Sequence, residues 1–274
     1  MSSHPDKKTL VFRQTNAQTG RHLAVAPANS AMQQLSYGRI RLNAQTPRVA
    51  FDTGGSETGL VCLSGSAQVT ANGEAHALGR YDALYIPRGA AVEVATDSEV
   101  DFVECSAPVE GDYPLQVVRY ESDVVPNAAL HFQAGGEGSS RTLNILIGKN
   151  VRAGRLVMGV TQSQPGHWTS WPPHEHAAML EELYVYYDMP APAFGIQFVY
   201  LDAQAPDEHA IVVRDGDAVL MPAGYHPNVS IPGHSINFLW AMAAHREVED
   251  RQFGVVNVQP DFDTSGSGLE ASHK

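Results

Sequence analysis

Two histidines, His174 and His176, stand one residue apart directly after a pair of prolines. In an extended strand both imidazoles leave the same face, because side chains alternate with a period of two. Glu181 and Glu182 follow where a new β-rich run begins, so a short hairpin would bring a carboxylate back beside the histidines. A further histidine, His226, lies behind a Pro-x-Gly sequence. Three neutral imidazoles and one carboxylate make a ligand set for a divalent transition metal, with coordination positions left open for substrate.

The residue types alone leave open which glutamate joins the histidines. Adjacent residues of a strand point to opposite faces, so only one of Glu181 and Glu182 can face the imidazoles. Tyr184 and Tyr186 share the face of Glu182. The other carboxylate is expected to be solvated. Glu175, between the two histidines, points away from them and is expected at the rim of the site.

β-Strands are expected to position these residues. Short apolar runs alternate with Gly, Asn and Asp along the chain, and helical periodicity is scarce. Residues 79–89 and 215–224 are similar, since each fragment has a Gly/Asp turn, a short strand and then Pro-x-Gly. Such a repeat indicates an internal duplication. We therefore predict an all-β chain of two similar units, separated by loop-like sequence in residues 107–145.

Composition and charge argue against several functional classes. The 274 residues carry a formal net charge of −12 without a Lys/Arg cluster, so nucleic acid and anionic membrane are not expected as partners. Cys62 and Cys105 lie in apolar runs as free thiols, and two cysteines cannot form a disulfide framework. The first residues lack an apolar signal core, and no segment approaches the ~20 apolar residues of a membrane span. A cytoplasmic location is expected, and exposed β edges are compatible with a homo-oligomer.

The motifs resemble those of a known superfamily. His-x-His followed by Glu, then Gly-x5-Pro-x-Gly with a histidine behind it, is similar to the two signature motifs of cupins. More closely, the chain resembles the 5-deoxy-glucuronate isomerases of inositol catabolism in residues 172–176, 181–184, 194–200 and 222–227. It also resembles the related 5-keto-4-deoxyuronate isomerases of pectin breakdown in residues 81–85, 156–159 and 184–189.

The resemblance implies a bicupin, a fold of two tandem double-stranded β-helix (jelly-roll) barrels. We expect an N-terminal barrel in residues 1–125, a C-terminal metal-binding barrel in residues 126–258 and a flexible tail in residues 259–274. The first barrel is expected to lack a metal site. It has no His-x-His, and alanines at Ala90 and Ala91 follow its Pro-x-Gly, where a cupin ligand histidine would stand.

One divalent metal ion per chain is expected in the second unit, with His174, His176, Glu182 and His226 as ligands. Glu182 is preferred to Glu181 because the ligand glutamate of the pectin-pathway relatives stands two residues before an aromatic residue. The spacing from His176 to this glutamate is one residue longer here, so the connecting loop must accommodate an insertion. Zinc is the first choice, with manganese, iron and nickel as alternatives.

The resemblance further implies a sugar-acid isomerase, most similar to 5-deoxy-glucuronate isomerase, that interconverts an aldose-type uronic acid and its ketose without a redox cofactor. Tyr186 and His167 are candidates for the base that moves the proton, with a metal-bound hydroxide as the alternative. His167 also fits a surface loop. Gln197, a polar residue in an apolar run, is a candidate to bind a sugar hydroxyl or a metal-bound water. Arg141 is a candidate to bind a substrate carboxylate.

Three other functions fit the same motifs. A 5-keto-4-deoxyuronate isomerase of pectin degradation would differ in the position of the substrate's ketone, which no motif decides. A cupin dioxygenase would use the same four ligands for Fe(II) and would consume oxygen. A sugar-binding regulator without enzymatic activity is the third alternative, but the chain has no basic stripe that would support a transcriptional role.

Overall fold

The computed structural model describes residues 7–205, 209–260, 262 and 270–271. These residues form β-strands and two short helical segments, α1 (Lys7–Leu10) and a π-helix (Tyr120–Val124). No helix in this part of the chain is long and apolar enough to cross a bilayer. The predicted scarcity of helix is therefore confirmed. Of the predicted flexible tail, residues 261, 263–269 and 272–274 lie outside the described residues.

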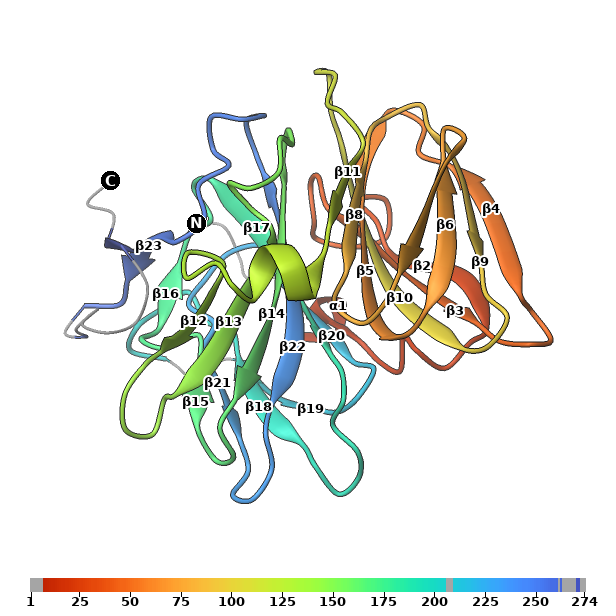
Figure 1. Ribbon diagram of the computed structural model, residues 1–274. Coiled ribbons are helices and arrows are strands. Elements are labelled where there is room, and N and C mark those ends of the chain that lie inside the picture. The colour runs from red at the N-terminus through yellow and green to blue at the C-terminus, as the bar shows by residue number, and fades with distance from the viewer. Residues whose placement is uncertain (1–6, 206–208, 261, 263–269, 272–274) are drawn as a thin grey trace.

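The first barrel consists of two antiparallel sheets, drawn mainly in red, orange and yellow in Figure 1. Its six-stranded sheet has the order β11-β8-β5-β10-β3-β2, and its four-stranded sheet has the order β4-β9-β6-β7. The strands are β2 (Gly20–Val25), β3 (Ser36–Leu42), β4 (Arg48–Asp52), β5 (Ser56–Gly65), β6 (Ala67–Ala71), β7 (Glu74–Leu78), β8 (Ala83–Ile86), β9 (Ala91–Ala95), β10 (Val100–Pro108) and β11 (Gln116–Val118).

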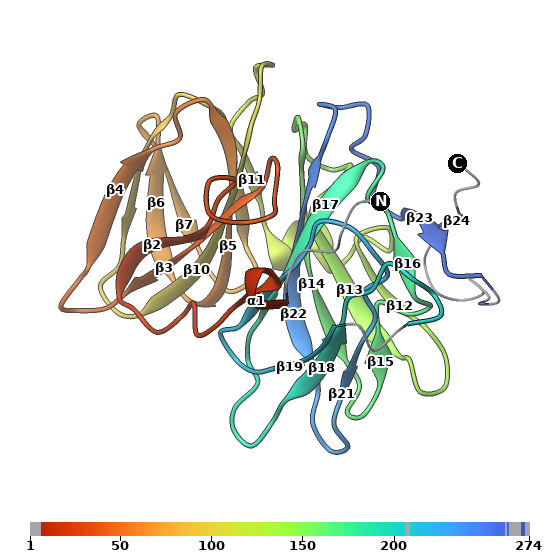
Figure 2. The ribbon, with the colours of Figure 1, turned by 180° about the vertical axis from the view of Figure 1, so that it is seen from behind.

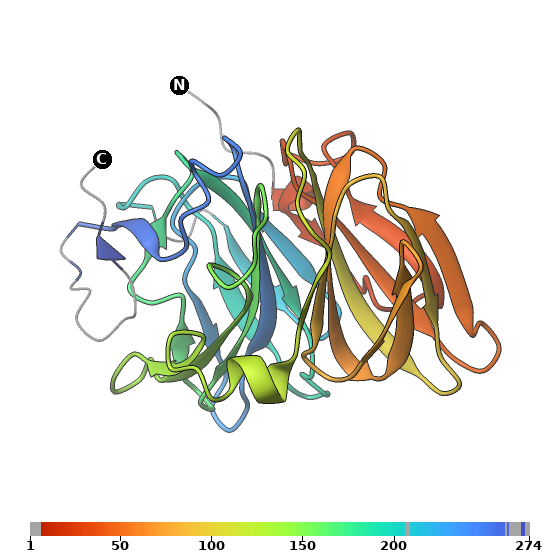
Figure 3. The ribbon, with the colours of Figure 1, turned by 45° about the horizontal axis from the view of Figure 1, so that its top comes forward.

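The second barrel is built on a seven-stranded sheet with the order β1-β20-β17-β22-β14-β13-β12. A four-stranded sheet, β15-β21-β18-β19, faces it, and the small sheet β16-β23-β24 lies on the side remote from the first barrel (Figure 3). The strands are β1 (Val11–Phe12), β12 (His131–Ala134), β13 (Arg141–Ile147), β14 (Leu156–Ser163), β15 (Trp168–Thr169), β16 (His174–Glu175), β17 (Leu180–Tyr186), β18 (Gly195–Phe198), β19 (Ala210–Val213), β20 (Ala218–Met221), β21 (Asn228–Ser230), β22 (Asn237–Ala244), β23 (Val255–Val258) and β24 (Glu270–Ala271).

The predicted all-β bicupin is confirmed by this architecture. One element crosses the expected division of the chain, because β1 pairs with β20 of the second barrel. Figure 2 shows α1 between the two barrels, ahead of the chain's entry into the first one. The first described residues thus pair with the sheet of the second barrel. The predicted boundary between the barrels near residue 125 stays a prediction.

Two buried carboxylates join the barrels in a reciprocal manner. Glu57 on β5 accepts hydrogen bonds from the main-chain N–H groups of residues 154–156 in the second barrel, at 2.6–2.7 Å. Glu181 on β17 accepts hydrogen bonds from the N–H groups of residues 33–35 in the first barrel, at 2.5–2.7 Å. Each carboxylate satisfies main-chain donors at the contact between the barrels, including buried ones such as the Leu35 amide. A continuous apolar core extends from this contact into the second barrel, and the first barrel has an additional core of its own.

Candidate functional site

Strand β17 positions the central carboxylate. It pairs with β20 on one side and β22 on the other, and all seven of its residues are buried. Because successive side chains alternate, Glu182 and Tyr184 face the interior of the second barrel, whereas Glu181 faces the first barrel. The expectation that Glu181 would be solvated was wrong. Only 1% of its surface is exposed, because the loop at residues 33–35 covers it.

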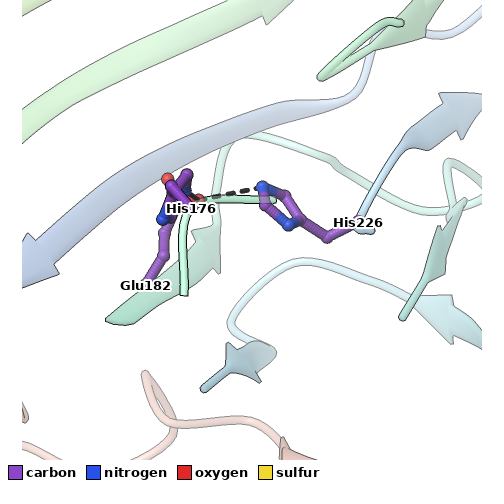
Figure 4. Close-up of side chains that lie close together, drawn as sticks. All are labelled: His176, Glu182 and His226. Atoms are coloured by element: carbon purple, nitrogen blue, oxygen red, sulfur yellow. Dashed lines mark hydrogen bonds and ion pairs between the residues drawn. The ribbon is translucent and has the colours of Figure 1, made fainter. Parts of the chain in front are cut away.

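His176, Glu182 and His226 converge inside the second barrel (Figure 4). Their potential ligand atoms lie within 4.8 Å of one another. The Oε2 atom of Glu182 is 3.0 Å from Nε2 of His176 and 3.1 Å from Nε2 of His226. His226 belongs to the loop between β20 and β21, so the group joins side chains from three separate segments.

Main-chain carbonyls fix the orientation of all three predicted ligand imidazoles. Each Nδ1 atom lies 2.8–3.1 Å from a carbonyl oxygen. The acceptors are the carbonyls of Pro172 for His174, Leu180 for His176 and Gly224 for His226. A carbonyl can only accept, so each Nδ1 carries the hydrogen, and a neutral ring presents a bare lone pair at Nε2. This is the arrangement that a metal-binding imidazole requires.

The charges in this group fit a divalent cation. Burial opposes ionisation of Glu182, but its contacts with His176 and His226 lower its pKa to about 2, so it is a carboxylate. Contact with Glu182 also raises the pKa of His176 against the effect of burial. The Nε2 atom of His226 is buried and has no hydrogen-bond partner among the described residues. Lone pairs directed at a carboxylate repel it unless a positive charge lies between them, and two imidazoles with one carboxylate suit a transition metal.

His174 lies beside this group rather than within it. The group whose ligand atoms lie within 4.8 Å of one another does not include His174, although its ring packs near the other two, with its centroid 4.9 Å from that of His226 and 6.3 Å from that of His176. Burial, together with the neighbouring His226, lowers the pKa of His174 to about 3, so the ring is neutral. The structure therefore brings three of the four predicted ligands into one group and places the fourth at its side.

A cavity of about 50 Å³ adjoins the three residues inside the barrel. Trp240 on β22 forms part of its wall and donates from Nε1 to Oγ1 of Thr161 at 3.1 Å. Gly159 allows this indole to lie against β14, since a Cβ atom there would collide with the ring. Tyr184, Ser170 and Arg141 supply further polar groups, and residues 253–256 close the cavity on the side of β23.

The three predicted catalytic residues lie away from the lining of this cavity, as far as the structure describes it. The Tyr186 hydroxyl donates to Oε1 of Gln197 at 2.5 Å. Nε2 of Gln197 donates to the main-chain carbonyl of His226 at 2.8 Å, so the amide holds the His226 loop in place. Nδ1 of His167 accepts a hydrogen bond from the Ser140 amide at 3.0 Å and joins two loops. Catalytic roles for these residues stay predictions.

Tyr184 and Ser170 are cavity residues that sequence reasoning did not select. Their hydroxyl oxygens are 2.7 Å apart, and both residues are buried. The alternation of β17 contains a signal for Tyr184, because it stands two residues after Glu182, but the same pattern is equally typical of a residue packed in the barrel core. No signal in the sequence points to Ser170, whose position depends on the loop before His174.

Comparison with known proteins agrees with this fold. The described barrels match the solved structure of an IolB-like protein from Salmonella typhimurium LT2 with a TM-score of 0.79 and 22% sequence identity, covering 91% of this chain and 96% of that one. A likeness at this identity concerns the fold alone.

Sequence comparison gives two groups of relatives. A 5-deoxy-glucuronate isomerase from Geobacillus kaustophilus is 31% identical over 168 residues, which is 58% of each chain. The alignment thus spans less than two thirds of that relative. A 4-deoxy-L-threo-5-hexosulose-uronate ketol-isomerase from Kineococcus radiotolerans is 32% identical over 209 residues, covering 73% of this chain and 71% of the relative. The family model described as the KduI/IolB family matches residues 10–258. This chain therefore belongs to the KduI/IolB family.

Proposed function

We propose that this protein is a metal-dependent sugar-acid isomerase, with 5-deoxy-glucuronate as the first candidate substrate and one divalent ion, zinc first, per chain. The observation that supports it most is the convergence of His176, Glu182 and His226 beside a buried cavity. Both groups of relatives are named as isomerases of uronate derivatives. The cavity lies in the second barrel, where most of the sequence motifs of the resemblance are also found.

The cavity residues suit the proton movements of an aldose–ketose isomerisation. One proton moves from C2 to C1 of the acid, and another moves from the C2 hydroxyl to the C1 oxygen. A divalent ion held by His176, Glu182 and His226 would supply Lewis acidity for the carbonyl. Burial raises the pKa of Tyr184 well above its ordinary value, so its hydroxyl remains protonated. We assign Tyr184, with Ser170 beside it, to donate a hydrogen bond to the substrate oxygen that receives a proton.

Exclusion of water is the second contribution of the chain. Trp240, Phe238 and the segment 253–256 enclose the cavity with apolar surface. In such a setting, hydrogen bonds and charges act more strongly on the reacting groups than they would in water.

A second candidate is the isomerisation of 4-deoxy-L-threo-5-hexosulose-uronate, also called 5-keto-4-deoxyuronate. It is favoured by the alignment with the Kineococcus radiotolerans relative, which covers 73% of this chain, against 58% for the Geobacillus kaustophilus relative. Both candidates carry a carboxylate at one end and undergo chemistry at the other, so they share the same requirements for the cavity.

Both candidates can be tested with the same purified protein. Zinc-loaded protein is incubated with each acid without oxygen, and the aldehyde and ketone signals are followed by NMR. We expect conversion of 5-deoxy-glucuronate that stops when a chelator removes the metal and returns when the metal is restored. Conversion of the second acid alone would support the second candidate. If neither acid is converted with zinc, manganese, iron or nickel, the isomerase proposal fails; oxygen consumption with Fe(II) would indicate a dioxygenase instead.

A further inference from the structure

Arg141 places a cation inside the same cavity. It is the first residue of β13, only 3% of its surface is exposed, and it lines the cavity together with His176 and Glu182. Burial lowers the pKa of its guanidinium to about 10, which still leaves it charged at neutral pH.

The loop before His174 fixes the position of this guanidinium relative to the candidate metal centre. Arg141 donates from Nη1 to the carbonyl of Ser139 at 3.0 Å and from Nη2 to the carbonyl of Trp171 at 2.9 Å. The next carbonyl along the chain, that of Pro172, accepts from Nδ1 of His174. Successive residues of one loop therefore orient the cation and a predicted metal ligand. Ser170, immediately before Trp171, contacts the Tyr184 hydroxyl.

A buried guanidinium in a small, mainly apolar cavity matches a carboxylate in charge and in geometry. Its planar N–H groups form paired hydrogen bonds with the two oxygens of a carboxylate, which a neutral hydroxyl or amide cannot reproduce. Uronic acids carry a carboxylate at the end of the chain opposite to the aldehyde. A substrate whose aldehyde end lies beside His176 and Glu182 would direct its other end into the remainder of the cavity.

We propose that Arg141 is the residue that selects the substrate, by binding the terminal carboxylate of a sugar acid while the carbonyl end lies at the candidate metal centre. This inference rests on the proposed isomerase function. It predicts that the site distinguishes sugar acids from neutral sugars of the same shape, and that this preference depends on Arg141.

The experiment must distinguish substrate binding by Arg141 from a purely structural role of this residue. Arg155 offers a matched control, because its guanidinium also binds main-chain carbonyls, those of Pro108, Ala244 and His245, but it does not line the cavity. The variants are Arg141→Met, Arg141→Lys and Arg155→Met. Arg141→Lys keeps a positive charge and a long stem, and it provides a folded variant if Arg141→Met is unstable.

The experiment measures binding by zinc-loaded protein of D-glucuronate and of D-glucuronamide, its neutral analogue, by calorimetry. Metal content and the midpoint of thermal unfolding are recorded for each variant. We expect the natural protein to bind the acid about tenfold to a hundredfold more tightly than the amide, as hydrogen bonds to a charged group allow. Arg141→Met should bind the two compounds equally and retain its metal. Arg141→Lys should keep part of the preference, and Arg155→Met should keep all of it.

Several outcomes would overturn the inference. One is a natural protein that binds both compounds equally, and another is an Arg141→Met protein that still prefers the acid because the carboxylate contacts the metal. A loss of preference shared by Arg155→Met, or accompanied by loss of metal, would indicate a structural role. These results are independent of the proposed reaction. An acid preference that depends on Arg141 without turnover of either uronic acid would refute only the isomerase proposal, and turnover unchanged in Arg141→Met would refute only the role of Arg141.

Discussion

Replacing Glu181 with alanine should weaken the contact between the two barrels and leave metal binding intact. Glu181 accepts hydrogen bonds from three main-chain N–H groups of residues 33–35, and its own side chain is almost completely buried. The neighbouring Glu182 faces the histidines instead. The two adjacent glutamates therefore have separable effects, one on stability and one on metal content.

The size of the stability loss in Glu181→Ala depends on the main-chain N–H groups of residues 33–35, which would lose their carboxylate acceptor. Gln33 is exposed, so water can replace the carboxylate at its amide, whereas Leu35 is fully buried and its amide would have no partner. Losing hydrogen bonds to a charged group and leaving one buried donor unsatisfied should lower the free energy of unfolding by about 3 kcal/mol. For a chain of this size, the midpoint of thermal unfolding should fall by about 6–12 °C.

The assay compares Glu181→Ala with Glu182→Gln in two measurements. Urea denaturation of metal-free protein gives the free energy of unfolding, and mass spectrometry gives the zinc content of the loaded protein. Glu181→Ala should unfold at lower urea and keep one zinc per chain, whereas Glu182→Gln should lose most of its zinc with little change in the metal-free midpoint. If Glu181→Ala lost the metal, or lowered the free energy of unfolding by less than about 1 kcal/mol, the division of roles argued from the hydrogen bonds would be refuted.

Three further predictions concern the cavity. His226→Ala should reduce the zinc content from one per chain to nearly zero while the circular dichroism spectrum is unchanged; full zinc content would exclude His226 as a ligand. Tyr184→Phe should lower kcat for the converted uronic acid about 100-fold or more with metal retained, because a hydrogen-bond donor to the reacting substrate oxygen is removed, and an unchanged kcat would exclude this role. Asn257→Ala removes the hydrogen bond to Glu175 that ties β23 to β16, and it should raise KM about threefold to tenfold. An unchanged KM in steady-state kinetics would show that residues 253–256 do not contribute to substrate retention.

The strands and the ligand motif could be predicted because both depend on local sequence. Strand alternation and Gly/Asn turns are properties of neighbouring residues, and the hairpin between β6 and β7 turns at Asn72 and Gly73 as the sequence indicates. The opposite faces of adjacent strand residues showed that only one of the two glutamates could face the histidines, and the family resemblance then favoured Glu182. The position of His226 beside Glu182 was predictable from the resemblance, although the two residues are far apart in the chain.

The environment of individual side chains could not be predicted in the same way, because it depends on segments that are remote in sequence. Glu181 is buried by residues 33–35, and nothing near Glu181 in the chain indicates this contact. Tyr184 and Tyr186 share one face of β17, so alternation cannot distinguish them. Their positions along the strand determine which of them lines the cavity. Tyr184 lines it, whereas Tyr186, two residues further along β17, contacts Gln197 instead.

The pairing registers of the two barrels show which positions correspond. In the first barrel Thr58 pairs with Ile86, and in the second Glu182 pairs with Met221. Ile86 and Met221 are each followed directly by Pro-x-Gly. These registers support the internal duplication and place Thr58 where the second barrel has its central carboxylate.

The same correspondence agrees with a candidate metal centre in the second barrel alone, since among the described residues the group of possible ligands is found there. Ala91 stands at the same distance after its proline as His226 does, so the first barrel lacks the carboxylate and a histidine at equivalent positions. The residue before each central position is nevertheless a glutamate in both barrels, Glu57 and Glu181, and each binds three amides of the opposite barrel. The paired carboxylates meet a packing requirement that both barrels share, since each must satisfy main-chain donors at the contact. The proposed metal ligands would meet a chemical requirement, for which one barrel is sufficient.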